Sequence, residues 1–166
     1  MGIIKIQTEK LVLKKLVQAD KERLVSLIGD FMVSKTLSNV PYPYTLDDAD
    51  EWLEIVDNEE FNLSIFLNND LIGGIGLTPL EDDFHELGYW LGVDYWGQGY
   101  ATESVRGLLN YAKSDTPCEK FKANVFKENV ASAKILEKNG FKRVGDEEVF
   151  SISRQENVLS VNYEYC

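Results

Sequence analysis

The spacing of apolar positions along the chain predicts its first elements. Residues 8–17 follow the two-residue alternation of apolar and polar side chains that is typical of a strand. Asp20 is suited to an N-cap, and the apolar residues after it recur every three or four positions, which predicts a helix. After the helix-breaking stretch 41–44 the same spacing resumes from Thr45 or Asp47, which predicts a second helix. The two apolar stripes are Leu24, Leu27, Ile28 and Phe31, then Ala49, Trp52, Leu53 and Val56.

The middle of the chain returns to alternation. Residues 63–67 alternate, and Asn68-Asn69-Asp70 has the composition of a tight turn. Residues 71–78 are therefore expected to pair back as a hairpin, and Pro79 ends this run. A further strand is predicted over residues 84–93.

The second half of the chain combines a glycine-rich turn with two helices. A long apolar stripe follows Gly97 and Gly99 and stops before Pro117, which predicts a third helix between them. Asn129 is a suitable N-cap for a fourth helix, and Gly140 is a suitable residue to follow its end. The remaining predicted elements are strands at 121–125, 144–152 and 158–165 and the helix from Asn129 to Asn139.

The resulting element order is βααβββαβαββ, an α/β or α+β mixture in which helices cover a mixed sheet. The strand–helix–strand unit over residues 84–125 needs a crossover connection, so those two strands are expected to be parallel. The sequence contains no internal repeat and no Pro-, Gly- or Ser-rich linker. At 166 residues it is the length of one domain, and we expect a single domain over residues 1–166.

Composition and charge narrow the function classes. Apolar residues make up 44% of the chain, yet no apolar run approaches the roughly 20 residues that span a bilayer. The N-terminus has no secretory leader pattern and lacks the Ser or Thr that a myristoylation motif requires, so a cytoplasmic location and no membrane partner are expected. Cys118 and Cys166 are expected to be free thiols. With His85 as the only histidine and no C-x-x-C, no metal site is expected.

The net charge of −11 also bears on partners. Nucleic-acid binding needs clustered Lys and Arg, so no nucleic-acid partner is expected. An acidic field favours cationic substrates such as amines, but an acidic surface also keeps a protein in solution, so the charge is a weak guide to function.

The segment Trp96-Gly97-Gln98-Gly99-Tyr100-Ala101-Thr102-Glu103 joins a strand to a helix and has the features of an anion cradle. Glycines let the backbone approach a ligand, and the first amides of a helix point outward without partners. The helix dipole adds partial positive charge, so a pyrophosphate is a natural occupant. A Walker loop is excluded because no Gly-Lys-Ser/Thr follows, and a Rossmann turn is disfavoured because Thr102 holds the third glycine position. From the loop alone, a plain helix start with turn glycines stays equally open.

Four segments in order make the chain resemble the GNAT superfamily of N-acetyltransferases, in particular the branch that acetylates the N-termini of ribosomal proteins. They are residues 8–16 (TEKLVLKKL), 86–91 (ELGYWL), 95–103 (YWGQGYATE) and 129–141, which contains Asn129-Val130-Ala131-Ser132 and Leu136-Glu137-Lys138-Asn139-Gly140-Phe141. Two positions depart from the superfamily pattern. Trp96 replaces the usual Gln or Arg, which that branch tolerates, and Leu136 stands where many members have a proton-donating Tyr.

The resemblance implies a mixed central sheet of about seven strands flanked by about four helices, with acetyl-CoA as cosubstrate. It implies that the glycine loop holds the pyrophosphate and that the strand before it pairs with the pantetheine arm. A bulge in that strand, favoured by Gly88 and Gly92, would free backbone amides near Tyr89 to Leu91 for the oxyanion. The expected cofactor-binding residues are Leu91, Gly92, Val93, Trp96, Gly97, Gln98, Gly99, Tyr100, Ala101, Thr102 and Asn129.

The implied reaction is direct attack of an amine on the thioester, in a ternary complex. An α-ammonium group has a pKa of about 8, so it must lose a proton before its nitrogen can attack the thioester. We predict that Glu86 is the base that takes this proton. The alternative for Glu86 is a surface or salt-bridged carboxylate, and Asp94 is a weaker candidate. Ser132 is predicted to donate to the leaving thiolate, or else it is an ordinary first-turn residue. Asn129 is predicted to contact the CoA arm, to cap its helix, or both.

Three aromatic residues, Tyr89, Trp90 and Tyr42, are expected to line an acceptor cleft, although Trp90 also suits a core position. The acceptor is expected to be a protein N-terminus, with a polyamine or another small amine as the alternative. Two other functions stay open, a CoA-binding module without catalysis and a nicotinamide-dependent oxidoreductase. Either a monomer or a homodimer is compatible with the sequence.

Overall fold

A computed structural model describes residues 3–115 and 119–165. Its strands are β1 (Lys5–Gln7), β2 (Val12–Lys14), β3 (Asn62–Leu67), β4 (Asp70–Pro79), β5 (His85–Leu91), β6 (Phe121–Phe126), β7 (Lys142–Ser151) and β8 (Glu156–Tyr165). Its α-helices are α1 (Lys21–Ile28), α2 (Phe31–Ser34), α3 (Leu46–Asp57), α4 (Tyr100–Asp115) and α5 (Val130–Lys138), and short 3-10 turns cover Gln18–Asp20 and Val93–Tyr95. The expectations for Met1-Gly2, Pro117, Cys118 and Cys166 fall outside the described residues.

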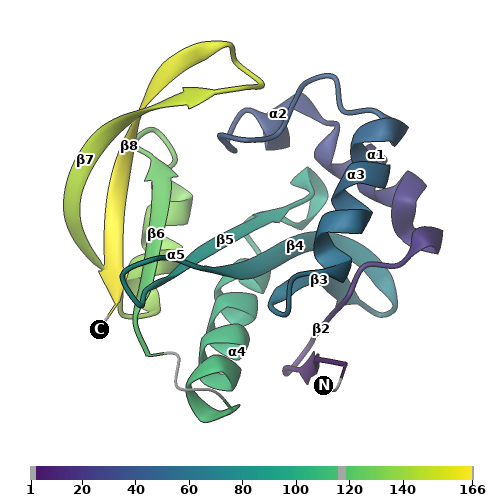
Figure 1. Cartoon of the computed structure of the whole chain (residues 1–166), viewed down its shortest axis with the longest axis horizontal. Helices are drawn as coiled ribbons and strands as arrows, with labels where there is room; N and C mark the ends of the chain where they lie inside the picture. Colours follow the sequence, from purple (N-terminus) through teal and green to yellow (C-terminus); the bar gives the residue numbers. More distant parts are fainter. Residues whose placement is uncertain (1–2, 116–118, 166) are drawn as a thin grey trace.

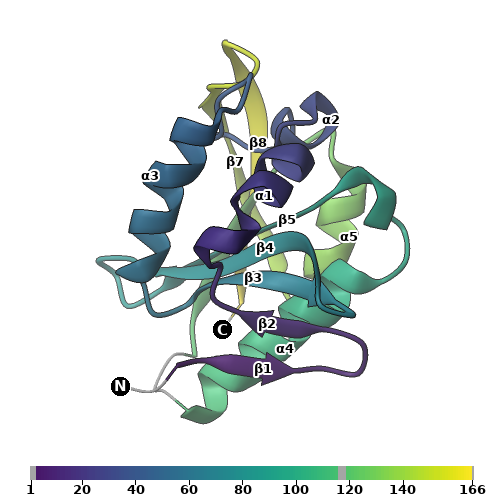
Figure 2. The ribbon, with the colours of Figure 1, turned by 90° about the vertical axis from the view of Figure 1, so that its right-hand side faces the viewer.

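One mixed sheet of eight strands runs through the fold in the order β1-β2-β3-β4-β5-β6-β8-β7. Every neighbouring pair is antiparallel except β5 and β6, whose parallel pairing confirms the predicted crossover through α4. Helices α4 and α5 lie on one face, and α1 to α3 lie on the other (Figures 1 and 2). The mixed α/β class is thus confirmed, with one more strand and one more helix than predicted.

Both extra elements come from the N-terminal third. The strand expected over residues 8–17 is confined to β2 at Val12–Lys14, and the added strand β1 precedes it. The chain turns between them at Thr8, whose amide donates to the Leu11 carbonyl at 2.9 Å. The helix expected from Asp20 through Phe31 divides after Ile28. Asp30 accepts from the Met32 amide at 2.9 Å and caps the separate helix α2. Asp20 makes no cap hydrogen bond to α1, since its carboxylate accepts from the Val17 amide at 3.0 Å.

Local chemistry fixes the other boundaries as predicted. Thr45 caps α3 through a reciprocal box in which its hydroxyl accepts from the Asp48 amide at 3.2 Å, while the Asp48 carboxylate accepts from the Thr45 amide at 2.8 Å. Asn68 and Asn69 take left-handed conformations, with φ of 51° and 70°, in the β3–β4 hairpin. Gly140 has φ of 90° after the end of α5.

Two apolar clusters pack on the two sheet faces. The larger one lies between the sheet and α4 and includes the fully buried Val105, Leu108 and Phe121. The smaller one joins α1 and α3 to β3 and β4 around Leu24, Leu53 and Phe66. Within residues 3–115 and 119–165, no helix combines the length and apolarity that crossing a membrane requires.

Candidate active site

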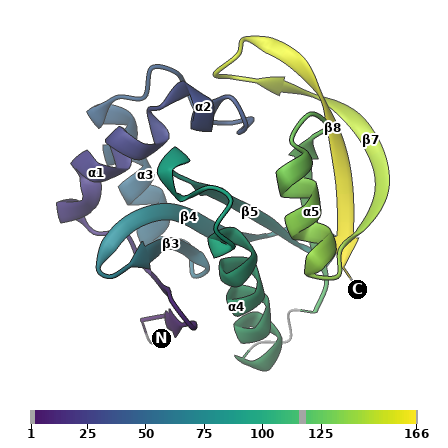
Figure 3. The same ribbon diagram turned by 180° about the vertical axis from the view of Figure 1, so that it is seen from behind.

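The central strands β5 and β6 pair only at their beginnings. Their register joins His85, Glu86 and Leu87 to Phe121, Lys122 and Ala123, and past these residues the two strands diverge (Figures 1 and 3). The His85 amide donates toward β6, to the Lys120 carbonyl at 2.9 Å, whereas the Gly92 amide donates toward β4, to the Ile72 carbonyl at 2.8 Å. The gap between β5 and β6 past Leu87 and Ala123 is called the opening. Because successive residues of a strand direct their peptide groups to opposite edges, the peptide groups of Tyr89 and Leu91 face the opening.

The opening has a different origin from the one predicted. The pairing of β5 with β4 is continuous from Leu91 to His85, so the bulge expected near Gly88 and Gly92 is absent from these two strands, which are described in full. The free strand edge arises because β6 leaves β5 after Leu87.

The loop after β5 places the start of α4 at this opening. Gly97 and Gly99 have φ of 74° and 84°, a left-handed conformation that glycine adopts without strain. The Trp96 indole turns back and donates to the Leu91 carbonyl at 2.8 Å, and the Gln98 side chain donates to the Asp94 carbonyl at 3.0 Å. The first amides of α4 have no intrahelical acceptor and carry the positive end of the helix dipole. The loop is therefore built to receive an anion.

A cavity of about 810 Å³ extends from this loop along the opening. Its walls come from α2, the end of β5, the loop, the start of α4 and helix α5. The predicted site residues that line it are Tyr89, Trp90, Leu91, Trp96, Gly97, Gly99, Tyr100, Ala101, Thr102, Asn129 and Ser132.

Four predicted binding residues lie outside the cavity walls. Gly92 and Val93 pack toward α1 and the second apolar cluster. Gln98 is held by the Asp94 carbonyl. Tyr42 lines neither this cavity nor the smaller one described below, and its ring packs edge-on against Phe31 at a centroid distance of 4.8 Å.

Glu86 lies in a second cavity of about 200 Å³ on the other side of the opening. The alternation along β5 puts the Glu86 side chain on the face opposite Leu87, which belongs to the core beneath α4. The two cavities share Thr36, Tyr89, Phe126, Asn129 and Ser132, which stand between them. Glu86 is exposed, accepts from the Asn124 amide group at 3.4 Å, and enters none of the ion pairs found among the described residues.

Comparison with known proteins places this geometry in a family. Residues 10–142 match the family model of the acetyltransferase (GNAT) domain. The chain belongs to the GNAT acetyltransferase family. It is 26% identical to the uncharacterized N-acetyltransferase p20 of Bacillus licheniformis over 149 residues, which cover 84% of this chain and 83% of that protein. Membership of this family and the similarity to p20 identify the chain as an N-acetyltransferase.

Two solved structures share the GNAT fold of this chain. A GNAT-family acetyltransferase from Bacillus anthracis superposes with a TM-score of 0.82 at 23% identity and covers 97% of both chains. A ribosomal L7/L12 alpha-N-protein acetyltransferase in complex with coenzyme A superposes with a TM-score of 0.81 at 16% identity, again over 97% of both chains.

In this GNAT acetyltransferase, Tyr89 and Ser132 meet between the two cavities. The Tyr89 hydroxyl donates to the Ser132 carbonyl at 3.1 Å, and burial raises the pKa of Tyr89 to about 12. Tyr89 therefore stays a neutral hydrogen-bond donor at neutral pH. The Asn129 side chain accepts from the Ser132 amide at 3.2 Å, so Asn129 both caps α5 and lines the cavities.

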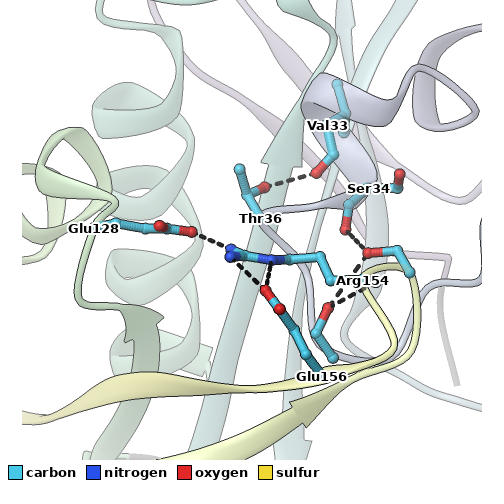
Figure 4. Close-up of polar contacts among 8 residues, drawn as sticks. Val33, Ser34, Thr36, Glu128, Arg154 and Glu156 are labelled. Atoms are coloured by element: carbon cyan, nitrogen blue, oxygen red, sulfur yellow. Dashed lines mark hydrogen bonds and ion pairs between the residues drawn. The ribbon is translucent and has the colours of Figure 1, made fainter.

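The β7–β8 connection supplies one cavity residue that the sequence did not indicate, Arg154. Arg154 forms ion pairs with Glu128 and Glu156 (Figure 4). The Ser153 hydroxyl donates to the Ser34 carbonyl at 2.9 Å. The Ile152 amide also donates to the Ser38 carbonyl at 3.0 Å. The bonds to Ser34 and Ser38 join segments more than 100 residues apart, which no local sequence motif predicts.

Proposed function

We propose that this GNAT enzyme transfers the acetyl group of acetyl-CoA directly to a primary amine, in a ternary complex, and that its acceptor is the α-amine of a protein N-terminus. The observation that carries the proposal is the opening between β5 and β6. Two cavities with shared wall residues lie beside it: one at a helix start, suited to an anionic cosubstrate, and one that the carboxylate-bearing Glu86 lines. We also propose that residues 1–166 form one domain, since a single sheet contains all the described strands from β1 to β8.

The residues of the larger cavity fit acetyl-CoA. The glycines at positive φ and the first amides of α4 suit a pyrophosphate, and the free edge of β5 at Tyr89 and Leu91 suits the amide groups of a pantetheine arm. When bound, acetyl-CoA supplies an activated acetyl thioester. The coenzyme A bound to the L7/L12 acetyltransferase of the same fold supports this assignment.

The proposed reaction begins with the removal of a proton from the acceptor. Glu86 takes it from the acceptor ammonium, directly or through water. The neutral amine then attacks the thioester carbon to form the C–N bond, and the C–S bond breaks with its electron pair left on sulfur. The second proton that nitrogen must lose passes to that thiolate, which gives the amide and the CoA thiol. The backbone amide of Tyr89 donates to the thioester oxygen, and the Ser132 hydroxyl donates to the departing thiolate. A free thiol has a pKa of about 8.5, so the thiolate can leave at neutral pH without being protonated. The proton-donating Tyr that Leu136 replaces is therefore not required.

The assignment of a protein N-terminus to the acceptor rests on the smaller cavity. Among the described residues that form its walls, Glu86 is the only charged one, and Ser38, Asn39 and Asn124 supply neutral polar side chains to the same walls. One carboxylate with neutral polar neighbours suits a single ammonium group, whereas a polyamine offers several ammonium groups and favours further carboxylates. The name of the L7/L12 acetyltransferase, which shares the fold, supports the same acceptor class.

Acetyl-CoA is expected to raise the melting temperature of the protein, and NAD(H) is expected to leave it unchanged. A ligand at about 100 times its Kd stabilises the folded state by roughly 2.7 kcal/mol. Differential scanning fluorimetry with acetyl-CoA, CoA and NADH measures both effects. Stabilisation by NADH alone would favour the oxidoreductase, and stabilisation by acetyl-CoA without turnover on a panel of peptides and amines would favour a non-catalytic CoA-binding module.

Ser132→Ala is expected to lower kcat by about tenfold, below the roughly 10²–10⁴ that obligatory acid–base groups contribute, because the thiolate can leave unaided. Steady-state assays with an N-terminal peptide measure the change. Ser114→Ala is the matched control, since Ser114 is an exposed α4 serine that bonds the Asn110 carbonyl and lines neither cavity. An unchanged kcat for Ser132→Ala would remove this hydroxyl from the reaction.

A further inference from the structure

The inner face of the β7–β8 hairpin continues the walls of the smaller cavity. Ser160 on β8 and Val149 on β7 line that cavity. Glu147 lies directly opposite Ser160 in the pairing of the two strands, and it is two residues before Val149. Directly opposed residues, and residues two apart in one strand, point to the same face of a sheet. The Glu147 side chain therefore stands on this inner face, at the rim of the smaller cavity.

Glu147 is a charged group without a partner. It is exposed and makes no ion pair or hydrogen bond to any residue that the structure describes. The cations of the same face are already compensated, since Lys122 pairs with Asp82, and Lys142 lies directly opposite Glu164. The arginine of the β7–β8 connection is paired as well. The Glu147 carboxylate is thus left for a cation that the chain itself does not supply.

An open path crosses the inner face from Glu86 to Glu147. It passes β6 at Asn124 and reaches β7 at Gly145, and these two residues lie opposite the same residue of β8. A Cβ added at Gly88 or Gly145 would meet no atom of the described residues within 4 Å, its chain neighbours aside. The sheet order β5-β6-β8-β7 gives three strand spacings, about 14 Å, which an extended chain covers in about four residues.

We infer that Glu147 binds a basic residue at about the third to fifth position of the acceptor polypeptide and makes the enzyme prefer acceptors that carry one. The inference rests on the proposed acetylation of a protein N-terminus. With the α-amine at Glu86, the residues that follow it lie along the path toward β7. A lysine or arginine side chain there meets the unpaired Glu147 carboxylate, so the two carboxylates hold two different cationic groups of one acceptor.

The test moves one positive charge along the acceptor. Hexapeptides of neutral residues with a single Arg at each position from the second to the sixth are compared with a peptide that has none. Arginine is used because its guanidinium is not a primary amine. At saturating acetyl-CoA, an Arg at the third to fifth position is expected to raise kcat/KM about fivefold, the upper range for one exposed ion pair. A higher salt concentration is expected to shrink this gain.

Variants of two neighbouring glutamates identify the group that is responsible. Glu147→Gln is expected to abolish the gain, and Glu147→Lys is expected to reverse it, so that a Glu in the peptide is favoured. Glu148→Gln and Glu148→Lys are the matched controls, because Glu148 is equally exposed but lies opposite Leu159, on the other face of β7. All four changes are on the surface, so the proteins are expected to fold, and their melting temperatures verify it.

A third variant tests the path itself. Gly145→Leu places a side chain in the open space at β7, far from Glu86 and from the glycine loop. It is expected to lower kcat/KM severalfold for the hexapeptides and to leave a dipeptide unaffected, because a dipeptide does not extend to β7. Equal rates for the unaltered protein and Gly145→Leu on every hexapeptide would mean that the acceptor takes another path, which overturns the inference.

The outcomes separate this inference from the proposed function. If the neutral hexapeptide reacts as fast as every Arg peptide, or if Glu147→Gln keeps the gain, Glu147 does not select the acceptor, while peptide acetylation stands. The same loss in the Glu148 variants would make the gain an effect of net charge and would also overturn the inference. Faster acetylation of spermidine than of every peptide would overturn the inference together with the proposed acceptor, and no turnover on any peptide would overturn the proposed function itself.

Discussion

Glu86→Gln is expected to lower kcat at pH 7 by about 10²–10⁴-fold, the range in which general bases contribute to enzyme reactions. The substitution keeps the size and the polarity of the side chain, and its amide can still contact Asn124, so the fold is expected to persist. The Kd for acetyl-CoA is expected to stay within about twofold, because Glu86 lies in the smaller cavity, on the other side of the opening from the glycine loop. Steady-state kinetics on an N-terminal peptide and calorimetry with acetyl-CoA measure the two quantities separately.

The pH profile of Glu86→Gln distinguishes a base from a carboxylate that only attracts the ammonium group. An α-ammonium loses its proton in solution near pH ~8. If the variant lacks only the base, its rate is expected to rise with pH through that range and to recover part of the loss. A loss that appears in the peptide KM at every pH would instead make Glu86 a binding residue.

Asp94→Asn is the matched control for Glu86→Gln. Asp94 is the other acidic residue considered near β5, and it is exposed and lines neither cavity. Its substitution is expected to leave kcat unchanged. A larger loss for Asp94→Asn than for Glu86→Gln would contradict the assignment of the base.

Elements governed by local chemistry were predictable from the sequence. The caps at Thr45 and Asn129, the hairpin at Asn68-Asn69 and the crossover between β5 and β6 each depend on residues close in the chain or on a topological rule. The glycine loop at the start of α4 belongs to the same class, since its positive φ values and its helix start are encoded within a few residues. Such features form in the same way wherever the segment lies in the fold, because the residues that determine them are close in the sequence.

Features that depend on distant partners were not predictable. The split of the first helix at Ile28 separates α1, which packs on α3, from α2, which reaches toward the cavity. The hydrogen bonds from the β7–β8 connection to Ser34 and Ser38 likewise join segments that are far apart in the sequence. The free edge of β5 was expected from a bulge within the strand, but it comes from the departure of β6, which only the tertiary structure reveals.

Phe121→Ala is expected to destabilise the protein by about 3–5 kcal/mol, a large share of the roughly 5–15 kcal/mol that stabilises a typical domain. Phe121 is fully buried, and its ring packs against Tyr165 at a centroid distance of 5.6 Å. It also pairs with His85 in the parallel contact between β5 and β6, which comprises three residue pairs. These pairs are the only ladder that joins the two parts of the sheet among the described strands, so a cavity at Phe121 weakens the joint from which the active-site opening diverges.

Chemical denaturation and thermal melting measure the effect of Phe121→Ala, and a loss of this size corresponds to a fall in Tm of roughly 10 °C for a domain of this length. Phe150→Ala is the matched control, because Phe150 lies on β7 with 52% of its surface exposed and is expected to change stability by less than about 0.5 kcal/mol. Similar losses for the two variants would mean that the joint between β5 and β6 does not limit the stability of the fold. Because the proposed acetyl-CoA site draws walls from both sides of that joint, saturating acetyl-CoA is expected to restore part of the lost Tm in Phe121→Ala.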